Sequence, residues 1–193
     1  HGGVPVKAAG EPNEEALLAG LDHLDKHLET AQHYGLPVLV AINVFPNDTR
    51  EELAAVQAAV EKRGGKVAVS EGFGKGGEGS LDLARAAIEM ADATDAAPPA
   101  ARFVYDTEET IPEKVRKIAT VVYGAKDVVF TGKAEKDIKR IVDLGYGKTP
   151  VCMAKTQLSL SDDPHKPGRP RDFTMTVREV RLSAGAGFVV PLT

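Results

Sequence analysis

The sequence predicts an α/β fold in which a mostly parallel, Rossmann-like sheet has helices on both faces. Strand-like and helix-like segments alternate through residues 37–154, and residues 37–42 form one continuous apolar run. Alternation of this kind is typical of a parallel sheet with crossover helices, and a continuous apolar run is typical of a strand buried on both faces. A loop and a β-rich tail are expected to follow the sheet.

We expect the chain to form two domains. Residues 1–155 are predicted to be an α/β domain that carries a ligand pocket. Residues 156–193 are predicted to be a loop plus a β-hairpin-like tail that packs on it. The first helix is expected over residues 14–33, because its leucines recur at spacings of three and four, with Asn13 as N-cap and Gly35 as its stop.

The remaining elements follow from the same kinds of pattern. A second helix is expected to begin at an Asp48 or Thr49 cap and to end at Lys62. In the tail, residues 172–181 alternate apolar and polar side chains as a strand does, and residues 185–187 are expected to turn into a last strand. The other predicted strands are 66–70, 103–105, 128–130 and 151–154, and the other predicted helices are 80–91, 111–123 and 134–144.

Composition favours a globular protein that acts on a small molecule. The chain has 193 residues, of which 42% are hydrophobic and 27% charged, and its formal net charge is −4. A negative balance without a Lys/Arg block argues against a nucleic-acid partner, and no apolar run is long enough to cross a membrane. We therefore expect a cytoplasmic protein with small-molecule substrates. Both ends are expected to be cut, because the chain opens without Met and stops straight after a strand-like run.

A glycine-rich segment, residues 70–79, lies between a predicted strand and a predicted helix. Open α/β sheets bind ligands at this place, beyond the carboxyl ends of their strands. Its five glycines allow a ligand to approach the backbone closely, and Lys75 adds a charge that suits an anion. The Walker spacing is absent. The alternative is a flexible surface loop.

Two phenylalanines follow neighbouring strands of the predicted sheet. Phe45 lies in the polar segment 43–49, and Phe73 lies in the glycine-rich segment. If the two strands are adjacent in the sheet, both rings open onto one crevice, where they form a slot for a flat ring. For Phe45 alone, the alternative is a side chain that fills the core.

The segment 156–171 is polar and rich in turn formers, and we expect a loop there. It carries paired carboxylates and several cations, for which solvated charge is the alternative to a binding role. Cys152, the single cysteine, lies in an apolar run and is expected to be a buried thiol. His23 and His27 are expected to be part of a polar helix face, and no metal site is expected.

Several long stretches of this chain resemble the formate–tetrahydrofolate ligase family. The resemblance covers essentially the whole chain. The matching stretches are residues 1–3, 36–43, 45–49, 74–79, 150–157, 159–164 and 177–188.

The resemblance implies an ATP-dependent ligase that makes 10-formyltetrahydrofolate. Formate is first phosphorylated by ATP, and a folate nitrogen then attacks the formyl phosphate. ATP with Mg and tetrahydrofolate are implied as substrates, and nothing is expected to bind this chain tightly. The family's phosphate loop lies before residue 1, so this chain alone is expected to be inactive. A homo-oligomer, or association with the missing ATP-binding portion, is also implied.

The resemblance further implies which residues contact the substrates. The folate ring is expected between Phe45 and Phe73. Two positions depart from the family pattern: Phe73 is commonly Trp there, and Leu158 is commonly Tyr. Residues implied on the folate side besides the two rings are Lys75, Gly76, Gly77 and Glu78, and those implied on the nucleotide side are Asp162, Asp163, Arg169 and Pro170.

Two other functions stay open at this stage. One is a stand-alone folate-binding or assembly subunit of a split ligase, without catalysis. The other is an unrelated nucleotide-binding domain, since a buried strand that ends in Asn43 with Asp48 beyond it is loosely similar to the base-reading strand of GTP-binding proteins. The spacing argues against this second alternative.

Overall fold

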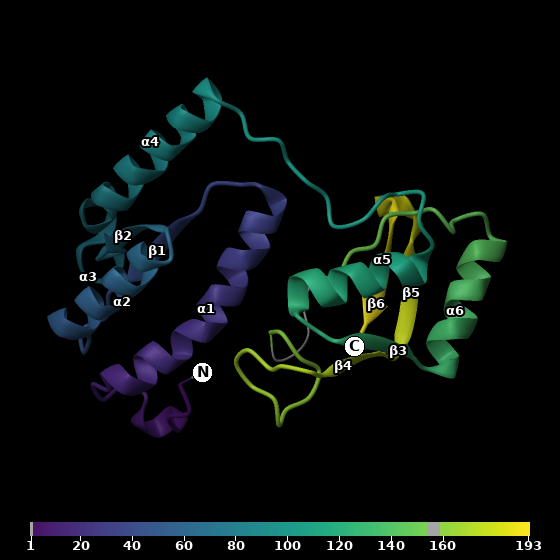
Figure 1. The fold of residues 1–193 in the computed structure, drawn as a ribbon, viewed down its shortest axis with the longest axis horizontal. Helices are drawn as coiled ribbons and strands as arrows, with labels where there is room; N and C mark the ends of the chain where they lie inside the picture. The colour runs from purple at the N-terminus through teal and green to yellow at the C-terminus, as the bar shows by residue number, and fades with distance from the viewer. Residues whose placement is uncertain (1, 154–158) are drawn as a thin grey trace. The chain divides into compact units, whose positions relative to one another are not determined.

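The computed structural model describes residues 2–153 and 159–193. They form two compact units, His1–Arg102 and Phe103–Thr193 (Figure 1). Both units mix helices with short strands, so the predicted α/β class is confirmed. The sequence predicts a division at residue 155, but residues 103–153 and the tail share one unit, because β4 of the tail pairs with β3, which precedes it.

Unit 1 is built on two adjacent parallel strands. β1 (Leu39–Asn43) and β2 (Lys66–Ser70) pair in parallel, and α2 (Arg50–Lys62) connects them. α1 (Glu14–Tyr34) packs on α2, and α4 (Leu81–Ala96) packs on the two strands. The short helical turns of this unit are η1 (Val6–Ala8), α3 (Gly72–Lys75) and η2 (Gly76–Ser80).

The helix ends of unit 1 follow their sequence signals. The Asn13 side chain accepts a hydrogen bond from the Ala16 amide at the start of α1, and Gly35 ends that helix in the left-handed conformation with φ 73°. Thr49, and not Asp48, is the N-cap of α2, where it forms a capping box with Glu52. α4 extends to Ala96, past its predicted end at residue 91.

Unit 2 holds two further two-stranded sheets. β3 (Asp127–Phe130) pairs in parallel with β4 (Thr174–Val177), and β5 (Glu179–Ser183) pairs antiparallel with β6 (Phe188–Leu192). The described strands of the chain therefore form three small sheets and not the single sheet expected. The helical segments of this unit are α5 (Ile111–Ile118), the π-helical η3 (Ala119–Tyr123), α6 (Gly132–Asp143) and η4 (Ala184–Ala186).

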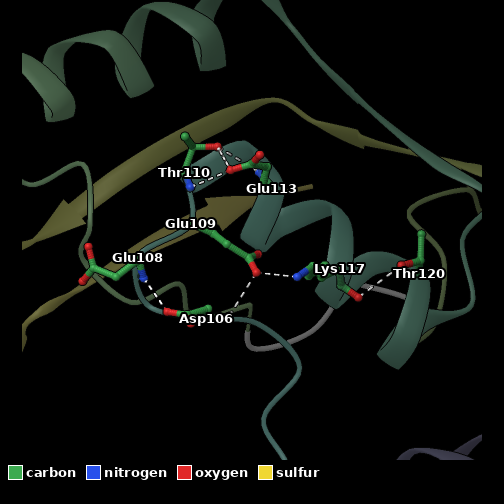
Figure 2. A network of polar contacts seen from close by, with 7 residues as sticks. All are labelled: Asp106, Glu108, Glu109, Thr110, Glu113, Lys117 and Thr120. Atoms are coloured by element: carbon green, nitrogen blue, oxygen red, sulfur yellow. Dashed lines mark hydrogen bonds and ion pairs between the residues drawn. The ribbon is translucent and has the colours of Figure 1, made fainter.

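α5 begins at a second capping box, formed by Thr110 and Glu113. The Thr110 hydroxyl accepts a hydrogen bond from the Glu113 amide, and the Glu113 carboxylate accepts one from the Thr110 amide at 2.8 Å (Figure 2). Glu109 directly precedes Thr110, and its carboxylate accepts a hydrogen bond from the Lys117 side chain further along α5 (Figure 2). This end of α5 is thus fixed by neighbouring residues of the chain.

The strand predicted at 151–154 is wrong for the residues that the structure describes, 151–153. Val151 makes a single bridge to Val189 of β6. The Tyr105 hydroxyl bonds to both the amide and the carbonyl of Val151, at 3.0 and 3.1 Å, and the Tyr123 hydroxyl donates to the Met153 carbonyl. The two tyrosine hydroxyls thus supply backbone hydrogen bonds that a neighbouring strand would supply. Cys152 is exposed, so the predicted buried thiol is also wrong.

Two further expectations differ from the structure. Residues 103–105 form no strand, and Phe103 is 84% exposed. The predicted strand at 172–181 is broken at Arg178 into β4 and β5, because the two halves pair with different partners. In the described part of the chain, no helix has the length and apolar character needed to cross a membrane.

Candidate functional site

The candidate site of unit 1 lies where β1 and β2 end side by side. Asn43 is the register partner of Ser70, so the carboxyl ends of both strands meet at one edge. The Val44 amide donates to the Ser70 carbonyl at 2.9 Å, which carries the pairing one residue further. The segments after the two strands, with Phe45 and Phe73, therefore start from neighbouring points, as the sequence analysis required for a shared crevice.

A tight turn holds Phe45 outward. Its amide donates to the Asp48 carboxylate at 2.8 Å, and the Asp48 amide donates back to the Phe45 carbonyl at 3.0 Å. Reciprocal bonds of this kind fix a short turn independently of the core. The Phe45 side chain is 50% exposed, so the alternative of a core-filling side chain is wrong.

The glycine-rich segment folds into two short helical turns, α3 and η2, and is not an open loop. The Glu71 amide donates to the Gly79 carbonyl at 2.9 Å and closes the segment on itself. A Cβ at Gly79 would lie 2.5 Å from the Glu71 carbonyl oxygen, and one at Gly72 would lie 2.7 Å from the Ser80 hydroxyl. Backbone packing therefore demands glycine at position 79, whereas the hydroxyl that a Cβ at position 72 would meet belongs to a side chain that can rotate.

The other three glycines of the segment have different surroundings. Gly76 has φ +59°, a conformation that favours glycine. A Cβ at Gly74 or Gly77 would meet no atom within 4 Å, and neither residue has a left-handed φ. Among the residues that the structure describes, nothing thus requires glycine at 74 or 77, and both residues are exposed.

The two predicted rings are in contact. The centroids of Phe45 and Phe73 are 5.3 Å apart, with 48° between the ring planes, and Phe73 is 70% exposed. Direct contact between exposed aromatic side chains leaves large apolar faces open to a partner. A flat ring stacked between them needs the centroids about 7 Å apart, since each carbon contact takes about 3.5 Å. A ligand would therefore move the two ring centroids roughly 2 Å further apart. The contact between the two rings would be replaced by two contacts, one from each ring to the ligand.

Lys75 is engaged within its own helical turn. Its Nζ lies 2.7 Å from the Glu71 carboxylate, so its charge is partly compensated. Glu71 is not among the predicted site residues, although its spacing of four from Lys75 is the usual signal for such a pair. Gly76, Gly77 and Glu78 are exposed, as Phe73 is.

Phe45 also borders a cavity of about 800 Å³ that is lined by the N-terminal segment before α1 and by residues of α1, β1 and α2. Among the predicted site residues it is Phe45 alone that lines this cavity, while Phe73 and residues 75–78 do not. The cavity and the exposed ring pair are therefore separate features that share one side chain.

The residues predicted on the nucleotide side lie in unit 2, in a loop between Leu160 and Phe173. The Asp162 carboxylate accepts a hydrogen bond from the Thr176 amide at 3.2 Å and so connects the loop to β4. The Asp163 carboxylate accepts from the His165 amide at 2.9 Å and lies 3.7 Å from Lys166. Arg169 and Pro170 are half-buried. Both carboxylates therefore stabilise the conformation of the loop, which is a structural role. Leu158 lies outside the described residues.

Local surroundings shift the pKa of a lysine side chain on α5. Burial lowers the pKa of Lys114. This residue is fully buried, and its Nζ donates hydrogen bonds to the carbonyls of Lys148 and Thr149 at 2.8 and 3.1 Å.

Within the residues described, no group of acidic, His or Cys side chains is arranged to hold a metal ion. His23 and His27 lie edge to face at 4.7 Å on α1.

Comparisons with known proteins agree on one family. The model of the formate–tetrahydrofolate ligase family matches residues 1–193. A formate–tetrahydrofolate ligase of Myxococcus xanthus (strain DK1622) is 56% identical over 193 residues, which is all of this chain and 35% of that protein. The chain thus spans about a third of the length of this relative.

Proposed function

The chain belongs to the formate–tetrahydrofolate ligase family, and from this premise we propose that it carries the folate-side pocket of an ATP-dependent ligase. The observation that carries the proposal is the contact between two exposed phenylalanines at the paired ends of β1 and β2. Exposed aromatic rings lower their free energy by stacking on a flat partner, at about 1–3 kcal/mol per ring face by analogy with base stacking. The pterin of tetrahydrofolate is such a partner.

The reaction proposed for the whole ligase has two steps. The formate carboxylate attacks the γ-phosphorus of ATP, which gives formyl phosphate and ADP. A nitrogen of tetrahydrofolate then attacks the formyl carbon, phosphate leaves, and the nitrogen loses its proton. Phe45 and Phe73 would orient the folate, and an oriented nucleophile accounts for much of the rate of such a transfer.

The ATP-binding portion is assigned outside this chain. Residues 1–193 contain no Walker spacing, and the relative is nearly three times as long. We propose that the isolated chain binds folate without turning over ATP, and that it acts by association with an ATP-binding portion or in a homo-oligomer. Asp162, Asp163, Arg169 and Pro170 are proposed to lie on the nucleotide side.

Calorimetric titration of the chain with tetrahydrofolate tests the folate pocket. We expect saturable binding that Phe73→Ala weakens roughly tenfold to a hundredfold, since the variant removes one stacking face. Phe103→Ala is the matched control, because Phe103 is also an exposed phenylalanine but lies in unit 2. Equal loss in both variants, or no binding to a folded wild-type chain, would contradict the proposal.

A further inference from the structure

Asp48 is a residue of the β1–α2 connection whose role the start of α2 does not explain. The sequence predicts Asp48 or Thr49 as the cap of α2, and the structure gives that role to Thr49. The carboxylate of Asp48 instead accepts a hydrogen bond from the Phe45 amide at 2.8 Å. One of the two rings of the proposed folate slot is therefore connected to this exposed side chain.

Residues 45–48 form a β-turn that holds the backbone of Phe45 in two ways. The Asp48 amide donates to the Phe45 carbonyl at 3.0 Å, which is the bond that closes such a turn, and Pro46 occupies the position that turns favour. Pro46 restricts the residue before it to extended conformations. The Asp48 carboxylate fixes the other side of the same residue through its amide. The direction in which the Phe45 side chain leaves the backbone is thus set in advance.

Both ends of this turn are attached to regular structure. Before it, the Val44 amide donates to the Ser70 carbonyl of β2 at 2.9 Å. After it, Thr49 forms the capping box of α2 with Glu52, whose carboxylate also accepts from the Asn13 amide at 2.7 Å. The carboxylate of Asp48 therefore acts on Phe45 from a point that a strand and a helix hold in place.

The turn that carries Phe73 is built differently. Its neighbour Gly74, and Gly77 beyond it, have the conformational freedom of glycine, and a Cβ at either would meet no atom within 4 Å. Phe73 is also the more exposed of the two rings. The rings must move apart by roughly 2 Å to admit a flat ring between them. The structure favours Phe73 as the ring that moves and Phe45 as the ring that stays in place.

We propose that Asp48 is a positioning residue, which holds Phe45 as the fixed wall of the folate slot. This assignment rests on the proposed function and adds to it a residue that acts through Phe45 and not on the folate itself. A wall that is already ordered lowers the entropy cost of binding. The role needs a hydrogen-bond acceptor of this length and no negative charge, so asparagine should replace Asp48 and alanine should not.

Calorimetric titration with tetrahydrofolate tests the role of the side chain. We expect Asp48→Ala to weaken binding roughly threefold to tenfold, since Phe45 must then be ordered on binding. Asp48→Asn should keep an affinity within about twofold of the wild type, because its side-chain carbonyl accepts the same bond. In a Phe45→Ala background, Asp48→Ala should have no further effect. Equal losses in the asparagine and alanine variants, or an undiminished loss in the Phe45→Ala background, overturn the proposal.

Asp106→Ala is the matched control for this titration. The carboxylate of Asp106 also accepts a hydrogen bond from a backbone amide at 2.8 Å, that of Glu108, but it lies in unit 2. We expect its removal to leave the affinity for folate unchanged. A loss as large as that of Asp48→Ala would show a general effect of removing such bonds, and this also overturns the proposal.

A measurement without folate separates this proposal from the proposed function. The ring protons of Phe45 are shifted by the ring current of Phe73, with which it is in contact, and Phe73→Ala calibrates that shift in the NMR spectrum. We expect Asp48→Ala to lose most of the shift and Asp48→Asn to keep it. If the wild-type chain binds no folate while Asp48→Ala still loses the shift, the proposed function fails and Asp48 nevertheless positions Phe45. An unchanged shift in Asp48→Ala overturns the positioning role whether or not folate binds.

Discussion

At the scale of single residues, the glycine-rich segment divides into glycines that the fold requires and glycines that it does not. Gly79 has no room for a Cβ beside the Glu71 backbone, and Gly76 has a positive φ. Gly74 and Gly77 have open space and ordinary backbone angles. Glycine in a helical turn costs about 0.5–1 kcal/mol relative to alanine, so its presence at these two positions lowers stability without a benefit to packing.

Alanine substitutions separate the two classes of glycine. We expect Gly74→Ala and Gly77→Ala to stabilise the chain by about 0.5 kcal/mol each, because alanine restricts the unfolded chain and meets no atom in the folded one. Gly79→Ala is expected to destabilise it by about 2 kcal/mol, because the new Cβ collides with the Glu71 carbonyl. Urea titration followed by circular dichroism measures all three. Destabilisation by Gly74→Ala would show that the segment packs differently.

Lys114 carries a second prediction at this scale. Its buried ammonium donates to the carbonyls of Lys148 and Thr149, and its Nζ lies 5.7 Å from the centre of the Tyr105 ring. Lys114→Met keeps the apolar stem and leaves both carbonyls without this donor, so we expect a loss of about 2 kcal/mol in unfolding free energy. Lys117→Met, at an exposed site on the same helix, is the control and should cost less than about 1 kcal/mol. Similar costs for the two variants would argue against a structural role for the buried amine.

At the scale of elements, the capping boxes predict how stability depends on pH. The Thr110 hydroxyl, followed by the Thr110 amide, lowers the pKa of Glu113 below its usual 4.5. The unfolded chain therefore binds more protons than the folded chain between the lowered pKa and 4.5. The contribution of Glu113 is complete above pH 4.5 and is lost as the pH falls through the folded pKa.

Thr110→Val removes this hydroxyl with little change in shape. We expect a cost of about 1 kcal/mol at pH 7 that shrinks as the pH falls below 4.5 and through the folded pKa of Glu113. Thr49→Val is the matched control, because the Asn13 amide is the largest cause of the lowered Glu52 pKa and stays in place. Thermal unfolding at pH 7, 5 and 3 measures both variants. A cost of Thr110→Val that does not change with pH would disprove the coupling to Glu113.

At the scale of the whole molecule, the two units have unequal cores. The buried hydrophobic side chains that the structure describes in unit 1 are Leu21, Leu28, Val60 and Ala68. Unit 2 buries one continuous cluster that joins α5, β3, β4 and β6 and includes Phe173 and Met175. Since buried apolar area is the main source of stability, unit 2 should be the more stable unit.

This difference predicts unfolding in two steps. We expect unit 1 to unfold at a lower urea concentration than unit 2, because two units whose cores differ in size unfold in separate transitions. Hydrogen exchange at increasing urea, read at Val60 for unit 1 and at Val128 for unit 2, measures the order. A single coincident transition at both residues would contradict it. Val60→Ala should lower the urea midpoint of the first transition and leave the midpoint of the second unchanged.

The sequence by itself determined the two ends of α1, the start of α2 within one residue, and the neighbouring placement of the two rings. Asn13, Gly35 and Thr49 act on backbone groups within four residues, so their effect is visible in the local sequence. The pairing of β1 with β2 follows from two apolar strands joined by a single helix. That pairing was enough to predict that Phe45 and Phe73 come together, which the structure confirms.

Only the tertiary structure decided which polar and apolar groups are buried. The sequence did not reveal that Tyr105 and Tyr123 replace a strand beside residues 151–153, that Lys114 is buried, or that Cys152 is exposed. These outcomes depend on partners more than 25 residues away along the chain, as with Tyr105 and Val151, 46 residues apart. A local pattern encodes the propensity of a segment, but burial is set by which distant groups supply its hydrogen bonds and apolar contacts.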